Sequence, residues 1–183
     1  MELDSLKEYL IEKFEEWVQE HRNLHLVNAR PLSDEERFRL SDYFEERILD
    51  VARIATIDHL SNPGFYNELI QSGMPVPLDL TQAIGFTLID CILIHKGLWS
   101  FPSMALSTIF HEMVHVVQAD ILGSRKLIEL YADNILQDEY RNVLFERQAY
   151  DLTDRFDRGE PSFSVRDIVE QELKNITQGH SNL

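Results

Sequence analysis

The stretch Ser103–Leu122 most constrains the fold of this chain, because it predicts a long helix that is apolar over much of its circumference. Pro102 suits the first turn of such a helix, and Gly123 is typical of its end. The apolar side chains recur at three- and four-residue spacing, the period of an α-helix. They are Leu106, Ile109, Phe110, Met113, Val114 and Val117. A stripe this wide favours burial, so we expect this helix to lie at the centre of the fold.

The rest of the chain predicts further helices and one small sheet. Two β-rich runs, Ile84–Leu88 and Cys91–His95, flank Ile89-Asp90 and predict a β-hairpin just before the central helix. The segment Ile48–Ile57 stays open, because its β-branched residues favour a strand but it could also prolong the helix before it. The further helices are expected at Leu3–His21, Asp34–Glu46, Phe65–Gln71, Arg125–Leu136, Arg141–Asp157 and Ser164–Ile176. The expected fold class is therefore α+β and mostly helical.

Composition excludes several classes of function. The 183 residues include 17 Lys and Arg against 32 Asp and Glu, a net charge of −15. Phosphate groups repel such a chain, so we expect it to bind neither nucleic acid nor an anionic membrane surface. Its one cysteine, Cys91, can form neither an internal disulfide nor a cysteine-rich metal site. No apolar stretch has the length of a signal peptide or a spanning helix, so we expect a cytoplasmic protein.

The pattern His111-Glu112-Met113-Val114-His115 carries the chemistry. Histidines four residues apart lie on the same face of a helix, one turn apart, so both imidazoles can bind one metal ion. Zinc accepts imidazole nitrogen and needs four ligands, one of which is water in a catalytic site. Glu112 stands beside that position, where a general base can take a proton from water. We therefore predict His111 and His115 as ligands and Glu112 as the base. The competing interpretation is two histidines that hold no metal.

A third protein ligand has to come from elsewhere in the chain. Three residues after the motif stands Gln118 and six after it Ile121, so the extended motif with a Gly and a third His does not apply. Downstream carboxylates that could complete the set are Asp120, Glu129, Asp133, Asp138, Glu139, Glu146 and Asp151. Glu146 is favoured, because it lies early in a strongly patterned helix. The small Ala149 follows at i+3 and would let this helix approach the helix of the two histidines closely. Asp133, one helix earlier, is the second choice.

Hydrolysis at such a site also needs a donor for the oxyanion of the transition state. The eligible side chains are Tyr131, Tyr140, Tyr150 and His95. Tyr150 is favoured because it shares a helix face with Glu146 at i+4, although a packing role explains it equally well. Gln118 faces the same way as His111, and either support of a metal ligand or simple packing explains its position.

Two segments of this chain resemble the zincin-like metallopeptidases of the gluzincin type. The first is His111–Gln118, HEMVHVVQ, and the second is Asn142–Tyr150, NVLFERQAY. More narrowly, they resemble small bacterial domains that carry a His-Glu-x-x-His-x-x-Gln helix and a Phe-Glu-x-x-Ala-Tyr helix. The resemblance covers about Thr81 to Phe156, less than half of the chain.

The resemblance implies a zincin-like fold with His111, His115 and Glu146 as zinc ligands and Glu112 as general base. It also implies that the edge strand of the hairpin pairs with an extended peptide substrate. We expect a single domain over 1–183, with an N-terminal helical part and extended connection (1–80), the hairpin and metal-site helices (81–158) and a C-terminal helix and tail (159–183). The predicted function is zinc-dependent hydrolysis of a peptide or protein substrate. The alternative is a metal-binding interaction module without turnover, or a domain associated with an effector system.

Overall fold

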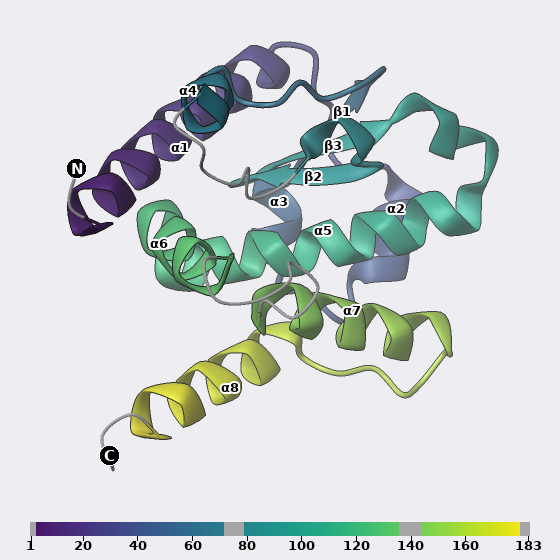
Figure 1. The fold of residues 1–183 in the computed structure, drawn as a ribbon. Helices are drawn as coiled ribbons and strands as arrows, with labels where there is room; N and C mark the ends of the chain where they lie inside the picture. Colours follow the sequence, from purple (N-terminus) through teal and green to yellow (C-terminus); the bar gives the residue numbers. More distant parts are fainter. Residues whose placement is uncertain (1–2, 72–78, 136–143, 180–183) are drawn as a thin grey trace.

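The computed structural model of the protein describes the backbone of residues 3–71, 79–135 and 144–179, and the side chains of residues 7–71, 79–131 and 144–174 (Figure 1). The α-helices are α1 (Leu3–Leu26), α2 (Asp34–Leu40), α3 (Glu46–Val51), α4 (Tyr66–Gln71), α5 (Pro102–Leu122), α6 (Ser124–Ile135), α7 (Leu144–Asp157) and α8 (Val165–Gly179). The strands are β1 (Arg53–Ile57), β2 (Gly85–Leu88) and β3 (Cys91–His95). A short 3₁₀ helix, η1 (Leu80–Gln82), precedes β2, and a second, η2 (Lys96–Ser100), follows β3. The prediction of a mostly helical α+β fold is confirmed.

The predicted hairpin is present and forms two of the three strands of the sheet. The strand order is β1-β3-β2, with β1 parallel to β3 and β2 antiparallel to it. Ile89 has a φ of 65° at the first turn position, as the primed two-residue hairpin turns require. The His95 N–H donates to the Ile84 carbonyl at 2.9 Å. Hydrogen bonding alternates along an antiparallel pair, so Gly85 and Thr87 direct their backbone polar groups away from β3.

The segment between the second predicted helix and the hairpin differs from the expected boundaries. The capping box of Ser33 and Glu36 starts α2 as expected, but this helix ends at Leu40 and not near Glu46. Ile48–Ile57 is neither one strand nor a prolonged helix. It divides into α3 and β1, because Ala52 turns to extended backbone with φ −58° and ψ 136°. α3 buries Ile48 and Leu49, and β1 can then pair with β3.

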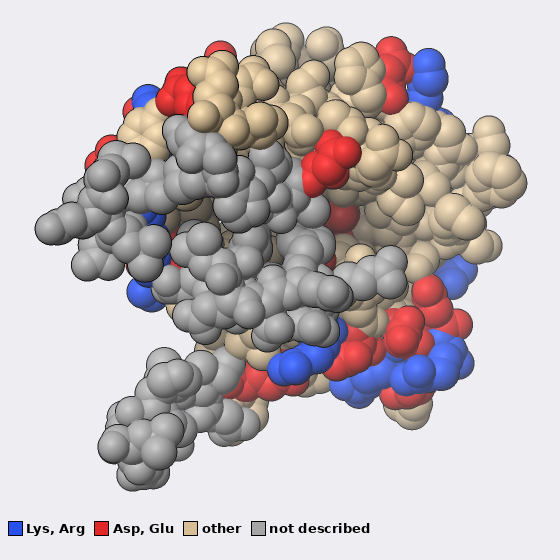
Figure 2. All heavy atoms as spheres, viewed as in Figure 1, with Lys and Arg blue, Asp and Glu red and all other residues tan. Residues whose placement is uncertain are grey.

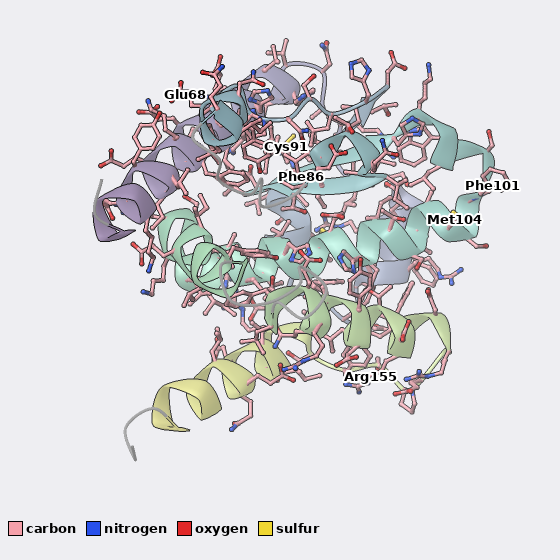
Figure 3. All side chains as sticks on the ribbon, in the orientation of Figure 1. Glu68, Phe86, Cys91, Phe101, Met104 and Arg155 are labelled. Atoms are coloured by element: carbon pink, nitrogen blue, oxygen red, sulfur yellow. The ribbon has the colours of Figure 1, made fainter. Side chains whose placement is uncertain are left out.

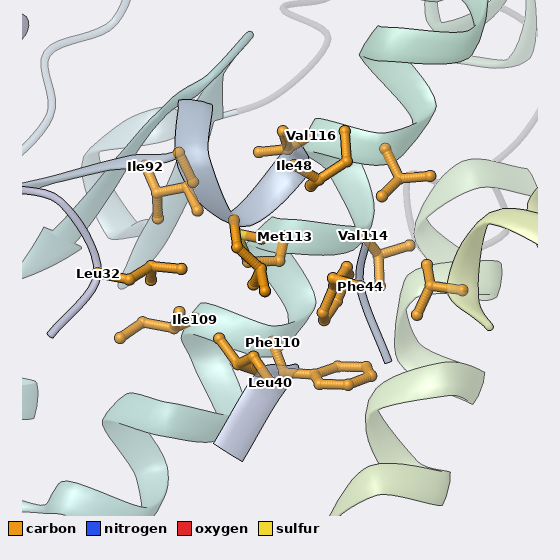
Figure 4. Close-up of a cluster of buried hydrophobic side chains, with 14 of the residues drawn as sticks. Leu32, Leu40, Phe44, Ile48, Ile92, Ile109, Phe110, Met113, Val114 and Val116 are labelled. Atoms are coloured by element: carbon orange, nitrogen blue, oxygen red, sulfur yellow. The ribbon is translucent and has the colours of Figure 1, made fainter. Parts of the chain in front are cut away.

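Helix α5 lies at the centre of the molecule, as its apolar stripe predicts. In Figure 1 it runs beneath the sheet, with α1 on the far side of the sheet and α7 on the far side of α5. Its inward side chains join residues of α2, α3 and β3 in the larger hydrophobic cluster (Figure 4). A second cluster, which includes Trp17 and Cys91, fills the space between α1 and the sheet. Among the described residues, no helix combines the length and apolarity needed to cross a membrane.

Candidate metal centre

The two histidines of α5 converge at the surface that faces α7. Their Nε2 atoms lie 3.2 Å apart, and His115 is buried while His111 is partly buried. Both residues stand on one face of α5 because they are four positions apart. The apolar residues between and around them anchor the opposite face of the helix in the core. The imidazoles are therefore held by a rigid element and not by a loop.

Helix α7 brings the carboxylate of Glu146 to the two imidazoles. Glu146 Oε1 lies 3.4 Å from His115 Nε2, and Glu146 Oε2 lies 3.5 Å from His111 Nε2. Ligand atoms about 2.0–2.1 Å from a tetrahedral zinc ion are about 3.3 Å apart. The separations of 3.2, 3.4 and 3.5 Å are close to this spacing, with one Glu146 oxygen facing each histidine. His111, His115 and Glu146 thus form a group that could hold a metal ion.

The other predicted carboxylates are not brought to this group in the part of the chain that the structure describes. Asp120 pairs with Arg47 and Arg166, and Glu129 pairs with Lys126. Asp151 is exposed on α7. The side chain of Asp133 lies outside the described residues, as do Asp138 and Glu139. Of the carboxylates whose side chains are described, Glu146 is the one that meets both histidines.

Gln118 determines which nitrogen of His115 is free to bind a metal. Gln118 is fully buried, and its Nε2 donates to the Phe145 carbonyl at 3.1 Å and to Gln148 Oε1 at 2.9 Å. Its Oε1 must then accept, and it lies 2.8 Å from His115 Nδ1. His115 therefore carries a proton on Nδ1, so a metal ion would bind through its Nε2, which faces the candidate site. The Gln148 amide donates in turn to Glu172 Oε2 at 2.6 Å, so this chain of hydrogen bonds ends on α8.

The electrostatics of the group favour a cation. Burial disfavours the charged form of His115, but the Glu146 carboxylate outweighs burial and raises the pKa of His115 to about 9. Glu146 itself is only 3% exposed. A buried carboxylate beside two imidazoles needs a positive charge, which either a proton or a divalent ion can supply. Two nitrogen donors and one oxygen donor are a ligand set that zinc accepts.

Glu112 lies beside the group without belonging to it. The Thr87 hydroxyl donates to Glu112 Oε2 at 2.7 Å and so fixes the carboxylate against β2. Gly85 permits this close approach, since a Cβ atom there would lie 2.7 Å from Glu112 Oε1 and 2.6 Å from Thr108 Cγ2. The carboxylate of Glu112 is thus held between α5 and the edge strand, next to the ligands and in the same cavity.

The candidate oxyanion donors occupy different places. The Tyr131 hydroxyl donates to Glu146 Oε1 at 2.8 Å, so it supports the carboxylate of the group. The Tyr150 ring lies 4.6 Å from the His111 ring between centroids, is 45% exposed and lines the cavity. His95 is occupied elsewhere, because its Nδ1 accepts the Gly97 N–H at the start of η2. Tyr140 lies outside the described residues. The role of Tyr150 stays a prediction.

The group opens into a cavity of about 770 Å³ that runs along α5 between β2 and α7. Figure 2 shows this face hollowed, with acidic side chains in and beside the hollow. The described acidic residues that line the cavity are Asp79, Glu112, Glu146, Asp154 and Asp157. A molecule in this cavity can therefore reach the ligand group, Glu112 and the outward-facing edge of β2 at once.

Sequence reasoning missed two residues of β2 and two that support His115. Gly85 and Thr87 are two apart in the predicted strand, so strand alternation could have placed them on one face. Gln148 and Glu172 carry no comparable signal, because a buried amide and a helix-surface carboxylate are common in any acidic helical chain. Their role emerges only when α5, α7 and α8 are packed together.

Comparisons with known protein families, with curated proteins and with solved structures find no match to this chain. The resemblance to zincin-like metallopeptidases therefore stays a prediction from the two motifs.

Proposed function

We propose that this protein is a zinc-dependent metallopeptidase that hydrolyses a peptide or protein substrate. The observation that supports the proposal is the convergence of His111, His115 and Glu146 at distances close to those between zinc ligands. Three protein ligands would leave the fourth position of a tetrahedral zinc ion to water. A structural zinc site is usually closed by four protein ligands and has no use for a carboxylate such as Glu112 beside it.

Each residue of the candidate site has a separate role in the proposed hydrolysis. When bound, a zinc ion supplies Lewis acidity, polarising a carbonyl group and lowering the pKa of a water molecule to ~7. Glu112 accepts the proton of the attacking water and passes it to the amine that leaves as the C–N bond breaks. Thr87 holds one oxygen of Glu112 for this transfer. Gln118 and Tyr131 hold His115 and Glu146 in place.

The edge strand β2 offers a place for the peptide backbone. Gly85 and Thr87 direct their backbone N–H and C=O groups away from β3, on the side of the cavity. An extended peptide can pair with these groups as an added strand. Since Gly85 lies against the Glu112 carboxylate, a peptide bond paired at this point is within reach of the base.

The test compares Glu112→Gln with the parent protein on a mixed peptide library, with cleavage followed by mass spectrometry. Glu129→Gln serves as the matched control, because Glu129 lies on α6 and pairs with Lys126 away from the group. We expect both variants to retain zinc, and Glu112→Gln to lose activity by roughly 10²- to 10⁴-fold. A parent protein that binds zinc but cleaves no peptide would favour the metal-binding module instead.

A further inference from the structure

One part of the cavity is lined by apolar side chains that have no role in the proposed hydrolysis. Beyond the ligand group, on the side of the C-terminal end of α5, half-buried apolar side chains from α1, the turn before α4, β2 and α6 form its wall. These are Leu10, Phe14, Phe65, Phe86, Leu127 and Ile128, and we call this part of the cavity the apolar chamber. Phe86 is labelled on β2 in Figure 3.

The apolar chamber is continuous with the ligand group and close to it. Both His115 and Ala119 line the cavity, and they stand four residues apart on α5. Four residues of helix rise about 6 Å. An extended peptide advances about 3.3 Å per residue, so the stretch of cavity wall from His115 to Ala119 corresponds to about two residues of a bound substrate.

The walls of the apolar chamber are not simply the edge of the core. Phe14, Phe65, Phe86 and Ile128 pack against the cluster between α1 and the sheet on one side and line the cavity on the other. Trp17 holds Phe14 and Phe86 from behind, with ring centroids at 5.5 and 6.0 Å. The aromatic wall is therefore fixed from the core side, and an apolar guest would remove its open faces from water.

Phe86 and Thr87 show how a bound peptide would meet both halves of the cavity. Successive residues of a strand point to opposite faces, so Phe86 faces α1 while Gly85 and Thr87 face α5. A peptide paired with β2 has the same alternation. It can present its backbone to the ligand group and a neighbouring side chain to the apolar chamber.

We infer that the apolar chamber is a specificity pocket that binds a large apolar side chain, such as that of Leu, Met or Phe, within a few residues of the bond that is cleaved. The inference rests on the proposed function, because it places the pocket relative to a bond that a peptidase would cleave. Binding to the chamber itself can be measured without turnover.

The experiment uses the full chain with Glu112→Gln, loaded with zinc, so that no peptide is consumed. Fluorescence anisotropy measures its affinity for blocked, labelled octapeptides of Ala and Ser in which one Phe is moved through each position. The same peptides with Asp in place of Phe are the comparison. We expect Phe to raise the affinity at least about tenfold over Asp at one or two adjacent positions.

Two pocket-filling substitutions and a matched control assign this preference to the chamber. Leu10→Trp and Ile128→Trp fill it from two different helices, α1 and α6, so the preference can still be tested if one of the two variants fails to fold. Leu24→Trp places the same side chain on α1 at a position that is 63% exposed. Filling should abolish the preference for Phe, and Leu24→Trp should leave it unchanged. Equal affinities for Phe and Asp peptides, or a preference that survives filling of the chamber, would overturn the inference.

The same variants, with Glu112 restored, separate this inference from the proposed function. A Phe preference that depends on the chamber, in a protein that cleaves no peptide, keeps the pocket and rejects the peptidase. Cleavage that shows no apolar preference keeps the peptidase and rejects the pocket.

Discussion

Replacing Gly85 by Ala should impair the site without removing its metal. The added Cβ atom would lie 2.6 Å from Thr108 Cγ2 and 2.7 Å from Glu112 Oε1, and both distances are too short for van der Waals contact. Either β2 must move away from α5 or the Glu112 carboxylate must turn. Each movement strains the 2.7 Å hydrogen bond from Thr87. Overpacking of this kind costs about 1–3 kcal/mol of the free energy of unfolding.

The expected effect on hydrolysis is of similar size in free energy but can be measured separately from the effect on folding. A displacement of about 1 Å of a group that positions the reaction can lower the rate about 10²-fold, which corresponds to about 2.7 kcal/mol. Zinc content should be unchanged, because neither Gly85 nor Glu112 belongs to the ligand group. Urea unfolding, zinc analysis and peptide cleavage measure the three quantities on one preparation.

Gly64→Ala is the matched control, since a Cβ atom there meets no atom within 4 Å. Adding Thr108→Ser to Gly85→Ala removes one of the two close contacts, so it should restore part of the stability but not the position of Glu112. The reasoning is refuted if Gly85→Ala is as stable and as active as Gly64→Ala.

Further predictions concern the support of His115, the single thiol and one acidic cap. Gln118→Leu removes the acceptor of His115 Nδ1, so zinc affinity should fall roughly 10- to 100-fold in competition with a chelating dye; an unchanged affinity would show that Gln118 only packs. Burial raises the pKa of Cys91 to about 11, so iodoacetamide at pH 8 should modify it only after unfolding, as mass spectrometry can show. Although burial opposes it, Arg30 and the Ser33 N–H lower the pKa of Glu36 below its ordinary value of 4.5. The stability that Glu36 provides should therefore be present above this value and be lost as the pH falls through the lower folded-state pKa. In urea unfolding the free energy of unfolding of the parent should exceed that of Glu36→Gln at pH 6, and the difference should become small toward pH 3. A difference that persists at pH 3 would contradict this cause.

The sequence predicts the elements whose signals are local. The apolar stripe of Ser103–Leu122 and the Ser33–Glu36 capping box depend on residues within a turn or two of each other, and α5 and the start of α2 lie as expected. The division of Ile48–Ile57 into α3 and β1 could not be predicted in this way. It depends on β3, which lies far along the chain and pairs with β1 in parallel.

The candidate site shows the same division. The spacing of His111 and His115 is a property of one helix, so their convergence follows from the sequence. The choice of Glu146 over Asp120 depends on how α7 packs against α5 and on the arginines that pair with Asp120. The hydrogen bonds from Gln118 through Gln148 to Glu172 join three helices, and no periodic pattern encodes them.

The most direct measurement is the zinc content per chain of the parent protein, Glu146→Ala and Asp151→Ala, purified without chelator and analysed by inductively coupled plasma mass spectrometry. Glu146 faces the imidazoles, whereas Asp151 is exposed on the same helix. We expect one zinc ion per chain in the parent and in Asp151→Ala, and a large loss in Glu146→Ala. Full zinc content in Glu146→Ala, or none in the parent after addition of zinc, would contradict a metal centre built from His111, His115 and Glu146.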